Sequence, residues 1–500
     1  MWSVAVSKLT LQLCWQMSSF ALPSNTAQFQ TRRQIMAITN MLSPLKKAPN
    51  ENATGEPLRI NSRLLGATLV AALGGLLFGF DTIVISGCQN QLKALFQLDS
   101  FQQGFMTASA IIGTVIGALS AGRPGDRFGR RDSLKAAGAL YFICALGCAL
   151  AWGFWPLIVF RIIGGVAVGA SSVLGPLYLA EISPAQWRGR LVAFFQFNIV
   201  VGVLLAFVSN FGLGTLGLGD TEWRWKLGVQ ALPAAAFFVL LFFIPRSPRW
   251  LMMKGVEGEA AEVLHSLGTL NVPAQIAAIR ESLHQELRGK AEPLFCRAHA
   301  KPIFLAITVA MFNQLDGINA LMYYAPRIFE MTGAGQNLAL LQSIAVGGTN
   351  LVFTLIGMSL IDWVGRRQLI IWGCYGYIAS LSTIAWAFYH YTGHFDQTGS
   401  LTILISLLIF QASHAFSQGA VIWVFISEIF PNAVRAKGQS LGSATHWFMA
   451  AAISWMFPVV AEWSGAGAFA FFAAMMVVQL LFAWKIMPET RGRRLEDATI

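Results

Sequence analysis

Long apolar segments recur along this 500-residue chain and constrain its fold more than any other feature. A helix that crosses a lipid bilayer needs about 20 mostly apolar residues. The sequence offers twelve such segments, near 64–87, 103–122, 134–153, 156–180, 190–212, 227–245, 302–322, 338–360, 368–390, 401–425, 438–460 and 466–487. Inside a bilayer, segments of this length satisfy their backbone hydrogen bonds as helices. We therefore predict an all-α membrane protein with twelve transmembrane helices.

The composition excludes most other classes of protein. Hydrophobic residues make up 55% of the chain and charged residues 12%, whereas charged residues are about 25% of ordinary soluble domains. A disordered chain, a collagen-like chain and a soluble enzyme are therefore excluded. The 6 cysteines form no CxxC pair. We predict no disulfide framework, no metal site, no cofactor and no catalytic residues.

The positive charges are distributed asymmetrically between the two sides of the predicted membrane domain. The net charge is +11, and almost all lysines and arginines fall in the termini and the loops on the same side as the termini. The opposite side holds only Lys93, Arg224, Lys226 and Arg327. Because positively charged loops stay in the cytoplasm, we expect both termini to be cytoplasmic, in a multi-pass protein of the cell (inner) membrane.

One long polar loop divides the predicted spans into six and six. We expect five parts: an N-terminal extension (1–60), a six-helix bundle (61–245), cytosolic linker helices (246–300), a second six-helix bundle (301–487) and a cytosolic tail (488–500). The extension contains no acidic residue before Glu51. It resembles a transit peptide, but a true start at Met36 or Met41 is the favoured interpretation.

Two charged motifs occur once in each half. Asp126–Arg131 matches Asp362–Arg367, and Glu181 with Arg188 matches Glu428 with Arg435. A duplicated bundle of this kind is typical of transporters that bind their substrate between the halves. Arginine pairs with carboxylates, so these residues can form cytosolic gating ion pairs. The alternative is that they only cap helices and fix the orientation in the membrane. The residues concerned are Asp126, Arg130, Arg131, Glu181, Arg188, Asp362, Arg366, Glu428 and Arg435.

Five further motifs carry a family resemblance. They are Gly74–Gly87, Arg127–Ser133, Gln314–Tyr324, Trp423–Asn432 and Pro488–Gly492. In this order they resemble the sugar porter family of the major facilitator superfamily, over about residues 62–497. The resemblance implies a major facilitator fold working by alternating access. It also implies a monomeric carrier with a small sugar, a proton and the lipid bilayer as partners, and neither enzymatic activity nor nucleic-acid binding.

The resemblance also implies a sugar site. Sugar hydroxyls both donate and accept hydrogen bonds, and amide side chains do the same, while aromatic rings cover the C–H surface of the sugar. The alternative for any one amide, and most evenly for Asn350, is a hydrogen bond between helices. Asn313 and His446 stand where related sequences have glutamine, so no particular sugar is predicted. The candidate residues are Phe78, Gln196, Asn313, Gln314, Asn319, Tyr323, Asn350, Gly419, Trp423 and His446.

Asp81 and Arg161 are charged residues within predicted spans, where charge is costly and usually functional. Span 1 runs outward and span 4 inward, so both residues fall at a similar depth in the outer half of the membrane. We expect them to form a pair that couples proton binding to transport, because a carboxylate that loses its arginine takes up a proton. The alternative is a permanent salt bridge in a passive carrier.

Asp316 is unusual for the resembled family. With Gly317 it can break span 7 and cap the helix that follows, or it can act as a second ionisable site. We favour the cap. His446 can titrate near neutral pH or hydrogen-bond the sugar, and we favour the sugar contact. The predicted function is a proton-coupled importer of a hexose or pentose, with a passive sugar uniporter and a non-transporting sugar sensor as alternatives.

Overall fold

The computed structural model describes residues 61–288, 292–391, 394–431 and 433–492, and all regular structure within them is helical. The predicted extension (1–60) and the last residues of the predicted tail lie outside the described residues. Among those residues, eleven helices are long and apolar enough to cross a bilayer. The predicted class, an all-α membrane protein, is therefore confirmed.

The helices fall into three consecutive groups. The amino-terminal group comprises α3 (Ser62–Val84), η2 (Ile85–Cys88), α4 (Gln89–Leu95), α5 (Ser100–Ser120), α6 (Gly122–Phe128), α7 (Arg130–Ala149), α8 (Phe154–Ile182), α9 (Ala185–Gly214), η3 (Gly219–Thr221), α10 (Glu222–Gly228) and α11 (Ala231–Leu240). The short middle group comprises α12 (Pro248–Met253), α13 (Glu257–Ser266) and α14 (Val272–Arg288). The carboxy-terminal group comprises η4 (Arg297–His299), α15 (Ala300–Leu315), α16 (Ile318–Met331), α17 (Gln336–Val364), α18 (Arg366–His390), α19 (Gln397–Phe416), α20 (Gln418–Glu428), α21 (Arg435–Trp463) and α22 (Gly465–Lys485).

The span predicted at 227–245 is the one that has no counterpart among these eleven helices. Its residues lie in α10 and α11, which are separated by a turn at Val229 and Gln230. Pro233 has no amide hydrogen to continue the helical ladder, and the carbonyl of Val229 accepts a bond from Leu232 instead, at 3.2 Å. Both pieces pack on α7, so the predicted segment is present as two short helices.

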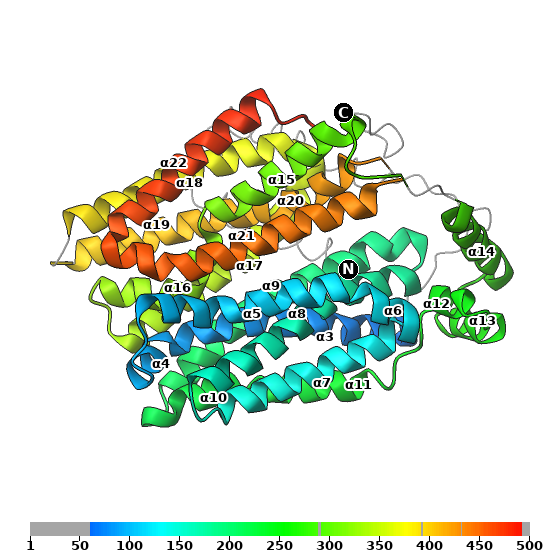
Figure 1. The fold of residues 1–500 in the computed structure, drawn as a ribbon, viewed down its shortest axis with the longest axis horizontal. Coiled ribbons are helices and arrows are strands. Elements are labelled where there is room, and N and C mark those ends of the chain that lie inside the picture. The colour runs from blue at the N-terminus through cyan, green and yellow to red at the C-terminus, as the bar shows by residue number, and fades with distance from the viewer. Residues whose placement is uncertain (1–60, 289–291, 392–393, 432, 493–500) are drawn as a thin grey trace, which may run out of the picture. The chain divides into compact units, whose positions relative to one another are not determined.

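The amino-terminal and carboxy-terminal groups lie side by side (Figure 1). Helix α5 packs on α21, and α9 packs on α17. The α5–α21 contact needs a residue without a side chain, because a Cβ atom at Gly104 would overlap the carbonyl oxygen of Trp455. Small residues at such contacts let helix backbones approach closely, which is how helices associate where no hydrophobic effect drives them together.

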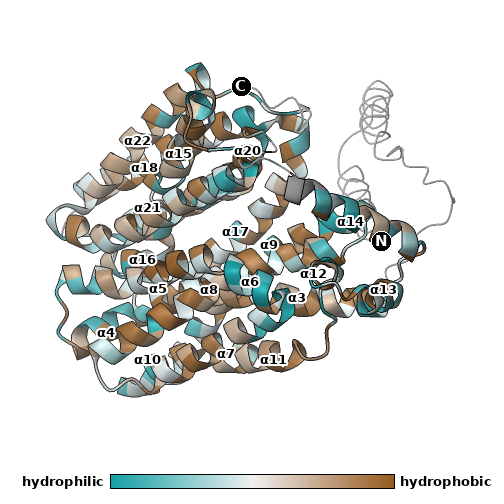
Figure 2. Cartoon of the chain, turned by 45° about the vertical axis from the view of Figure 1, so that its right-hand side comes forward, coloured by the Kyte–Doolittle hydropathy of each residue, from teal (hydrophilic) through white to brown (hydrophobic). Residues whose placement is uncertain are grey.

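The polar residues gather at one end of the long helices. Hydrophobic residues cover most of the long helices, whereas α6 and parts of α13 and α14 are hydrophilic (Figure 2). We call the end that carries α6, α12–α14 and the turn between α17 and α18 the charged end.

Polar contacts join the two large groups at the other end, which we call the opposite end. Gln89 Nε2 donates to the carbonyl of Tyr323 at 3.0 Å. Tyr324 Oη donates to Thr107 Oγ1 at 3.0 Å, and Arg327 donates to Gln103. These contacts connect η2–α5 to α16, so the two groups are held together at the opposite end in this conformation.

Candidate functional site

An arginine-centred ion cluster lies at the charged end of the amino-terminal group. Arg130 begins α7 directly after Gly129, whose φ of +94° favours glycine. Its Nε donates to Glu181 Oε1 and its Nη1 to Asp126 Oδ1, both at 3.0 Å. Nη1 also donates to the carbonyl of Gly125 at 2.8 Å. Arg130 and Glu181 are buried, so this cluster fastens α6, α7 and α8 to one another.

The same cluster recurs in the carboxy-terminal group. Arg366 begins α18 after Gly365, whose φ is +100°. Its guanidinium donates to the two oxygens of Glu428 at 3.1 and 2.9 Å, to Asp362 at 3.1 Å and to the carbonyl of Ile361 at 3.0 Å. The repeat seen in the sequence therefore corresponds to one local structure that is built twice.

Each cluster also contains a hydroxyl group that the motif analysis missed. Ser247 donates to Glu181 Oε2 at 2.5 Å, and Thr490 donates to Glu428 Oε2 at 2.6 Å. The sequence held a signal for them, since each hydroxyl residue stands two positions after a proline, Pro245 or Pro488, that follows the last span of its half.

The residue between proline and hydroxyl differs between the halves. Glu489 accepts the backbone N–H groups of Arg366 and Arg367 at 3.0 and 3.1 Å and so caps α18. Arg246 occupies the corresponding place in the first half and faces Asp132 at 3.7 Å and Glu259 at 3.6 Å. The first half therefore replaces a helix cap with a link to α13.

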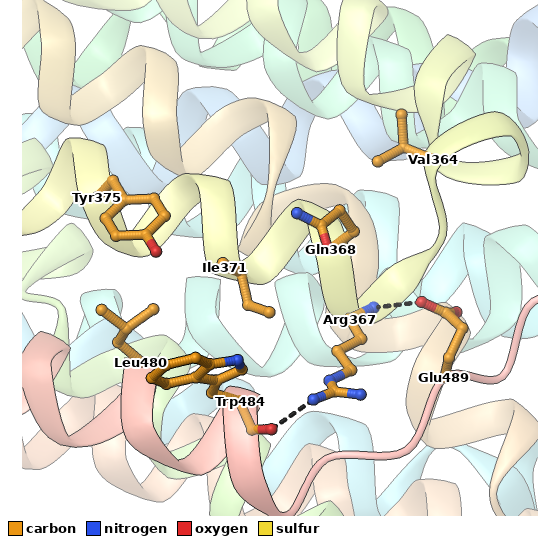
Figure 3. A pocket seen from close by; sticks show the side chains of 8 residues that line it. All are labelled: Val364, Arg367, Gln368, Ile371, Tyr375, Leu480, Trp484 and Glu489. Carbon is orange, nitrogen blue, oxygen red and sulfur yellow. Dashed lines mark hydrogen bonds between the residues drawn. The ribbon is translucent and has the colours of Figure 1, made fainter.

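A pocket of about 550 Å³ adjoins the second cluster. Figure 3 shows Arg367 between Glu489 and Trp484, with Tyr375 and Leu480 along the same groove between α18 and α22. No residue predicted to bind sugar lines it.

The remaining predicted gating residues lie outside these clusters or at their edge. Arg131 pairs with its neighbour Asp132 at 3.1 Å and donates to the carbonyl of Ile244 at 3.2 Å. Arg188 is exposed, and no ion pair within 4.0 Å involves it among the described residues. Glu181, which the sequence motif groups with Arg188, pairs with Arg130 instead. Arg435 begins α21.

Asp81 and Arg161 face each other deep within the amino-terminal group. Arg161 Nη1 lies 3.9 Å from Asp81 Oδ1, and it donates to the backbone carbonyl of Asp81 at 3.4 Å. Both side chains are at most 2% exposed. Gln230, at the break between α10 and α11, and Cys144 of α7 also lie against the Asp81 carboxyl group. Gln230 was not predicted from the sequence.

A hydrogen-bonded polar cluster surrounds the end of α15. Gln314 Nε2 donates to Asn313 Oδ1 at 2.8 Å and lies 3.2 Å from His446 Nδ1. Asn319 Nδ2 donates to Gln314 Oε1 at 2.5 Å. The structure therefore brings four of the predicted sugar residues together, with Gln314 at their centre.

Aromatic rings border this polar cluster from both groups of helices. Trp423 and Trp447 each lie 4.9 Å from the ring of His446, measured between ring centroids. Phe78 of α3 lies 5.8 Å from Trp447, so a residue of the amino-terminal group reaches this edge. Trp447 was not predicted, although it adjoins His446 in the sequence.

The other predicted sugar residues are more dispersed. Gln196 of α9 and Asn350 of α17 are half-buried on two helices that pack together, and Asn350 Oδ1 accepts a bond from Thr354 at 3.4 Å. The Tyr323 side chain contacts Thr82, next to Asp81. Tyr323 is therefore directed toward the Asp81–Arg161 pair.

Spans 7 and 10 are both interrupted within the carboxy-terminal group. Gly317, with φ +87°, separates α15 from α16, and Ser417 separates α19 from α20. Asp316 Oδ1 accepts the N–H of Ile318 at 2.8 Å, so Asp316 does cap α16. Its Oδ2 lies 2.8 Å from Nδ1 of His414, a residue that sequence reasoning missed because its partner is 98 positions away.

Comparison with known proteins agrees with this architecture. A family model described as "Sugar (and other) transporter" matches residues 67–500. The D-xylose-proton symporter of Escherichia coli (strain K12) is 37% identical over 478 residues, which cover 87% of this chain and 95% of the relative. The arabinose-proton symporter of Bacillus subtilis (strain 168) is 36% identical over 433 residues, covering 85% and 92%.

A solved structure supports the same assignment. The partially occluded, inward-open conformation of the xylose transporter XylE from E. coli matches with a TM-score of 0.76 and 34% sequence identity, covering 87% of this chain and 100% of that one. The major facilitator fold is therefore shown. This chain belongs to the sugar transporter family, and it is a multi-pass membrane transporter of monosaccharides, not an enzyme.

Proposed function

We propose that this protein imports a hexose or pentose together with protons, by alternating access. The buried pair of Asp81 and Arg161 carries the coupling. Two relatives, at 37% and 36% identity, are named proton symporters, which supports the same mode of transport here.

The Asp81–Arg161 pair is incompletely satisfied. Asp81 Oδ2 and the Nε and Nη2 atoms of Arg161 are buried and have no hydrogen-bond partner among the described residues. Two charges buried without full hydrogen bonding gain little from each other after the cost of desolvation. A small displacement of α3 relative to α8 therefore suffices to separate them, and the isolated carboxylate then takes up a proton.

The polar cluster around Gln314 is the proposed sugar site. It offers amide donors and acceptors beside three aromatic rings, which suits a neutral polyol. Each hydrogen bond contributes about 1 kcal/mol net, so several are needed for micromolar to millimolar affinity. Phe78 and Asp81 belong to the same helix, α3. Sugar contact with Phe78 can therefore move the helix that carries the coupling carboxylate.

The two arginine clusters are proposed to act as latches at the cytoplasmic side, each between helices of its own group, so that both can stay closed while the groups move apart. By the positive-inside rule we place the charged end on the cytoplasmic side of the cell membrane, the side on which the sequence predicts both termini. In the present conformation the two groups are joined at the opposite end through Gln89, Thr107 and Tyr324. This suits a state that opens toward the cytoplasm, like the inward-open structure it matches.

The membrane potential alone sets a scale for the expected accumulation. Moving one charge through 100 mV supplies about 2.3 kcal/mol. Since about 1.4 kcal/mol corresponds to a factor of ten, one proton per sugar sustains roughly a 50-fold gradient.

Uptake into liposomes tests the proposal. Purified protein would be reconstituted and given labelled D-xylose, L-arabinose or D-glucose, with an inward proton gradient and with a protonophore. We expect accumulation that the protonophore abolishes. Asp81→Asn should keep sugar exchange and lose accumulation, whereas Asp220→Asn, an exposed aspartate in η3, should match the wild type. Equilibration without accumulation in the wild type would instead identify a passive uniporter.

A further inference from the structure

The interruptions in spans 7 and 10 meet at one buried acid–base pair. Asp316 lies between α15 and α16, and His414 lies in the last turn of α19. Asp316 is fully buried and the His414 side chain is 12% exposed. The described ion pairs of Asp316 include no arginine or lysine, so the imidazole of His414 is its counter-charge.

One helix end adjoins each member of this pair. The N-terminus of α16 presents a positive dipole end to the Asp316 carboxylate, which already accepts the N–H of Ile318. The C-terminus of α19 presents a negative end to the imidazole of His414. Interrupted membrane helices with such exposed ends are where transporters bind substrates and coupling ions.

Few other titratable groups face the pair. Tyr377 and Cys374 approach from α18, and the Tyr377 hydroxyl lies 3.3 Å from His414 Nδ1. His446 of α21 lies within electrostatic range of His414. None of these three side chains carries a permanent charge. The net charge at this place therefore depends on whether the Asp316–His414 pair holds a proton.

The free edge of the imidazole lies beside Gly419, one of the residues predicted to bind sugar. A Cβ atom at Gly419 would lie 3.4 Å from Cδ2 and 3.5 Å from Nε2 of His414, on the ring edge away from Asp316. Trp423 is one helical turn beyond Gly419 on α20, and its ring contacts His446. Nε2 of His414 therefore lies beside α20, the helix that also carries Trp423.

We propose that Asp316 and His414 together bind a proton, and that Nε2 of His414 uses it to hydrogen-bond a sugar hydroxyl. This inference rests on the proposed function and adds a second proton-linked site, independent of Asp81. When the pair holds this proton, Asp316 is a carboxylate and His414 an imidazolium. The net charge is zero, and the Nε2–H group donates to the sugar. Without it the pair is negatively charged and Nε2 is only an acceptor.

The proton on the pair determines how sugar affinity changes with pH. A hydrogen bond from an imidazolium is stronger than one from a neutral group, so sugar binds more tightly to the protonated pair. The dissociation constant should therefore rise with pH, by up to about tenfold per pH unit for one linked proton.

The test measures sugar affinity against pH in purified full-length protein. Binding of D-xylose and of D-glucose would be followed by tryptophan fluorescence, since Trp423 and Trp447 lie in the proposed site. Isothermal titration in buffers of different ionisation enthalpy would count the linked protons. Asp316→Asn retains an oxygen that caps Ile318 but removes the carboxylate, and His414→Gln removes the base. His390→Gln, an exposed histidine at the end of α18, is the matched control.

We expect Asp316→Asn and His414→Gln to lose this part of the pH dependence and of the proton count. Asp81→Asn and His390→Gln should keep it. If both dyad variants bind sugar with the wild-type pH profile, Asp316 is only a helix cap and the inference is overturned. If the pH dependence disappears with Asp81→Asn alone, the inference is likewise wrong while the proposed function stands. A wild-type protein that binds no sugar contradicts both.

Discussion

Both halves of this transporter place an acid–base pair within their predicted spans, and these two pairs differ in kind. Asp81 meets an arginine at 3.9 Å and keeps unsatisfied polar atoms, whereas Asp316 meets a histidine at 2.8 Å and also caps a helix. The arginine guanidinium keeps its proton at any accessible pH, whereas a histidine imidazole exists in a neutral and a protonated form. The first pair can therefore change its proton count only on the acid, but the second can change it on the base.

Because their partners differ, the two pairs respond to different events. A loosely held carboxylate beside a fixed charge responds to helix movement, because separation from Arg161 leaves it unpaired. A tightly bonded dyad anchored at two helix ends responds to the proton and to a ligand at Nε2.

The largest effect is expected from Arg161→Met. It leaves the Asp81 carboxyl buried without a counter-charge, which should destabilise the protein by about 3–5 kcal/mol. Thermal or denaturant unfolding in detergent measures this. The double variant Asp81→Asn, Arg161→Met should recover most of the loss, and failure to recover would show that the arginine acts through packing alone.

Asp316→Ala should cost more stability than Asp316→Asn. Asparagine still accepts the N–H of Ile318, whereas alanine removes the cap, which is worth about 1 kcal/mol. The comparison separates the capping role of Asp316 from its charge. Equal stability of the two variants, measured under the same conditions, would mean that the cap contributes nothing.

Gln314→Ala should weaken sugar binding about five- to tenfold, since it removes hydrogen bonds worth about 1 kcal/mol net. Its side chain belongs to the helix that ends at Asp316 but holds no proton. The pH profile of binding should therefore keep its shape. A changed profile would show that the sugar cluster and the dyad are one site.

Tyr377→Phe should have the smallest effect. The Tyr377 hydroxyl lies 3.3 Å from both His414 Nδ1 and Ser417 Oγ, distances at which a hydrogen bond contributes little, so the stability change should stay below about 1 kcal/mol. Unfolding and sugar affinity would both be measured. A large loss of sugar affinity would show that Tyr377 positions the imidazole of His414.

Much of the fold could be predicted from the sequence, because a membrane span is recognised from the hydrophobicity of one short stretch of chain. Apolar runs of sufficient length predicted the helical class. The recurrence of the Asp126–Arg131 motif at Asp362–Arg367 predicted two similar bundles. The sixth segment shows the limit. Its hydrophobicity predicted a span, but Pro233 and the turn at Val229 and Gln230 divided it into two helices.

The candidate site was only partly accessible. Family motifs pointed to Gln314, Asn319 and Trp423, and matching depths pointed to Asp81 with Arg161. Gln230, Ser247 and Thr490 were missed, although the repeated spacing after Pro245 and Pro488 could have revealed the two hydroxyl residues.

The sequence alone determined the helical membrane class, the duplication and the residues of the repeated arginine motifs, because hydrophobic length and local charge patterns act over short stretches of chain. Only the tertiary structure decided that Asp316 meets His414 and that the ring of the latter turns toward Gly419. Such contacts join helices about a hundred residues apart, and their geometry depends on how two interrupted helices pack, which no local pattern encodes.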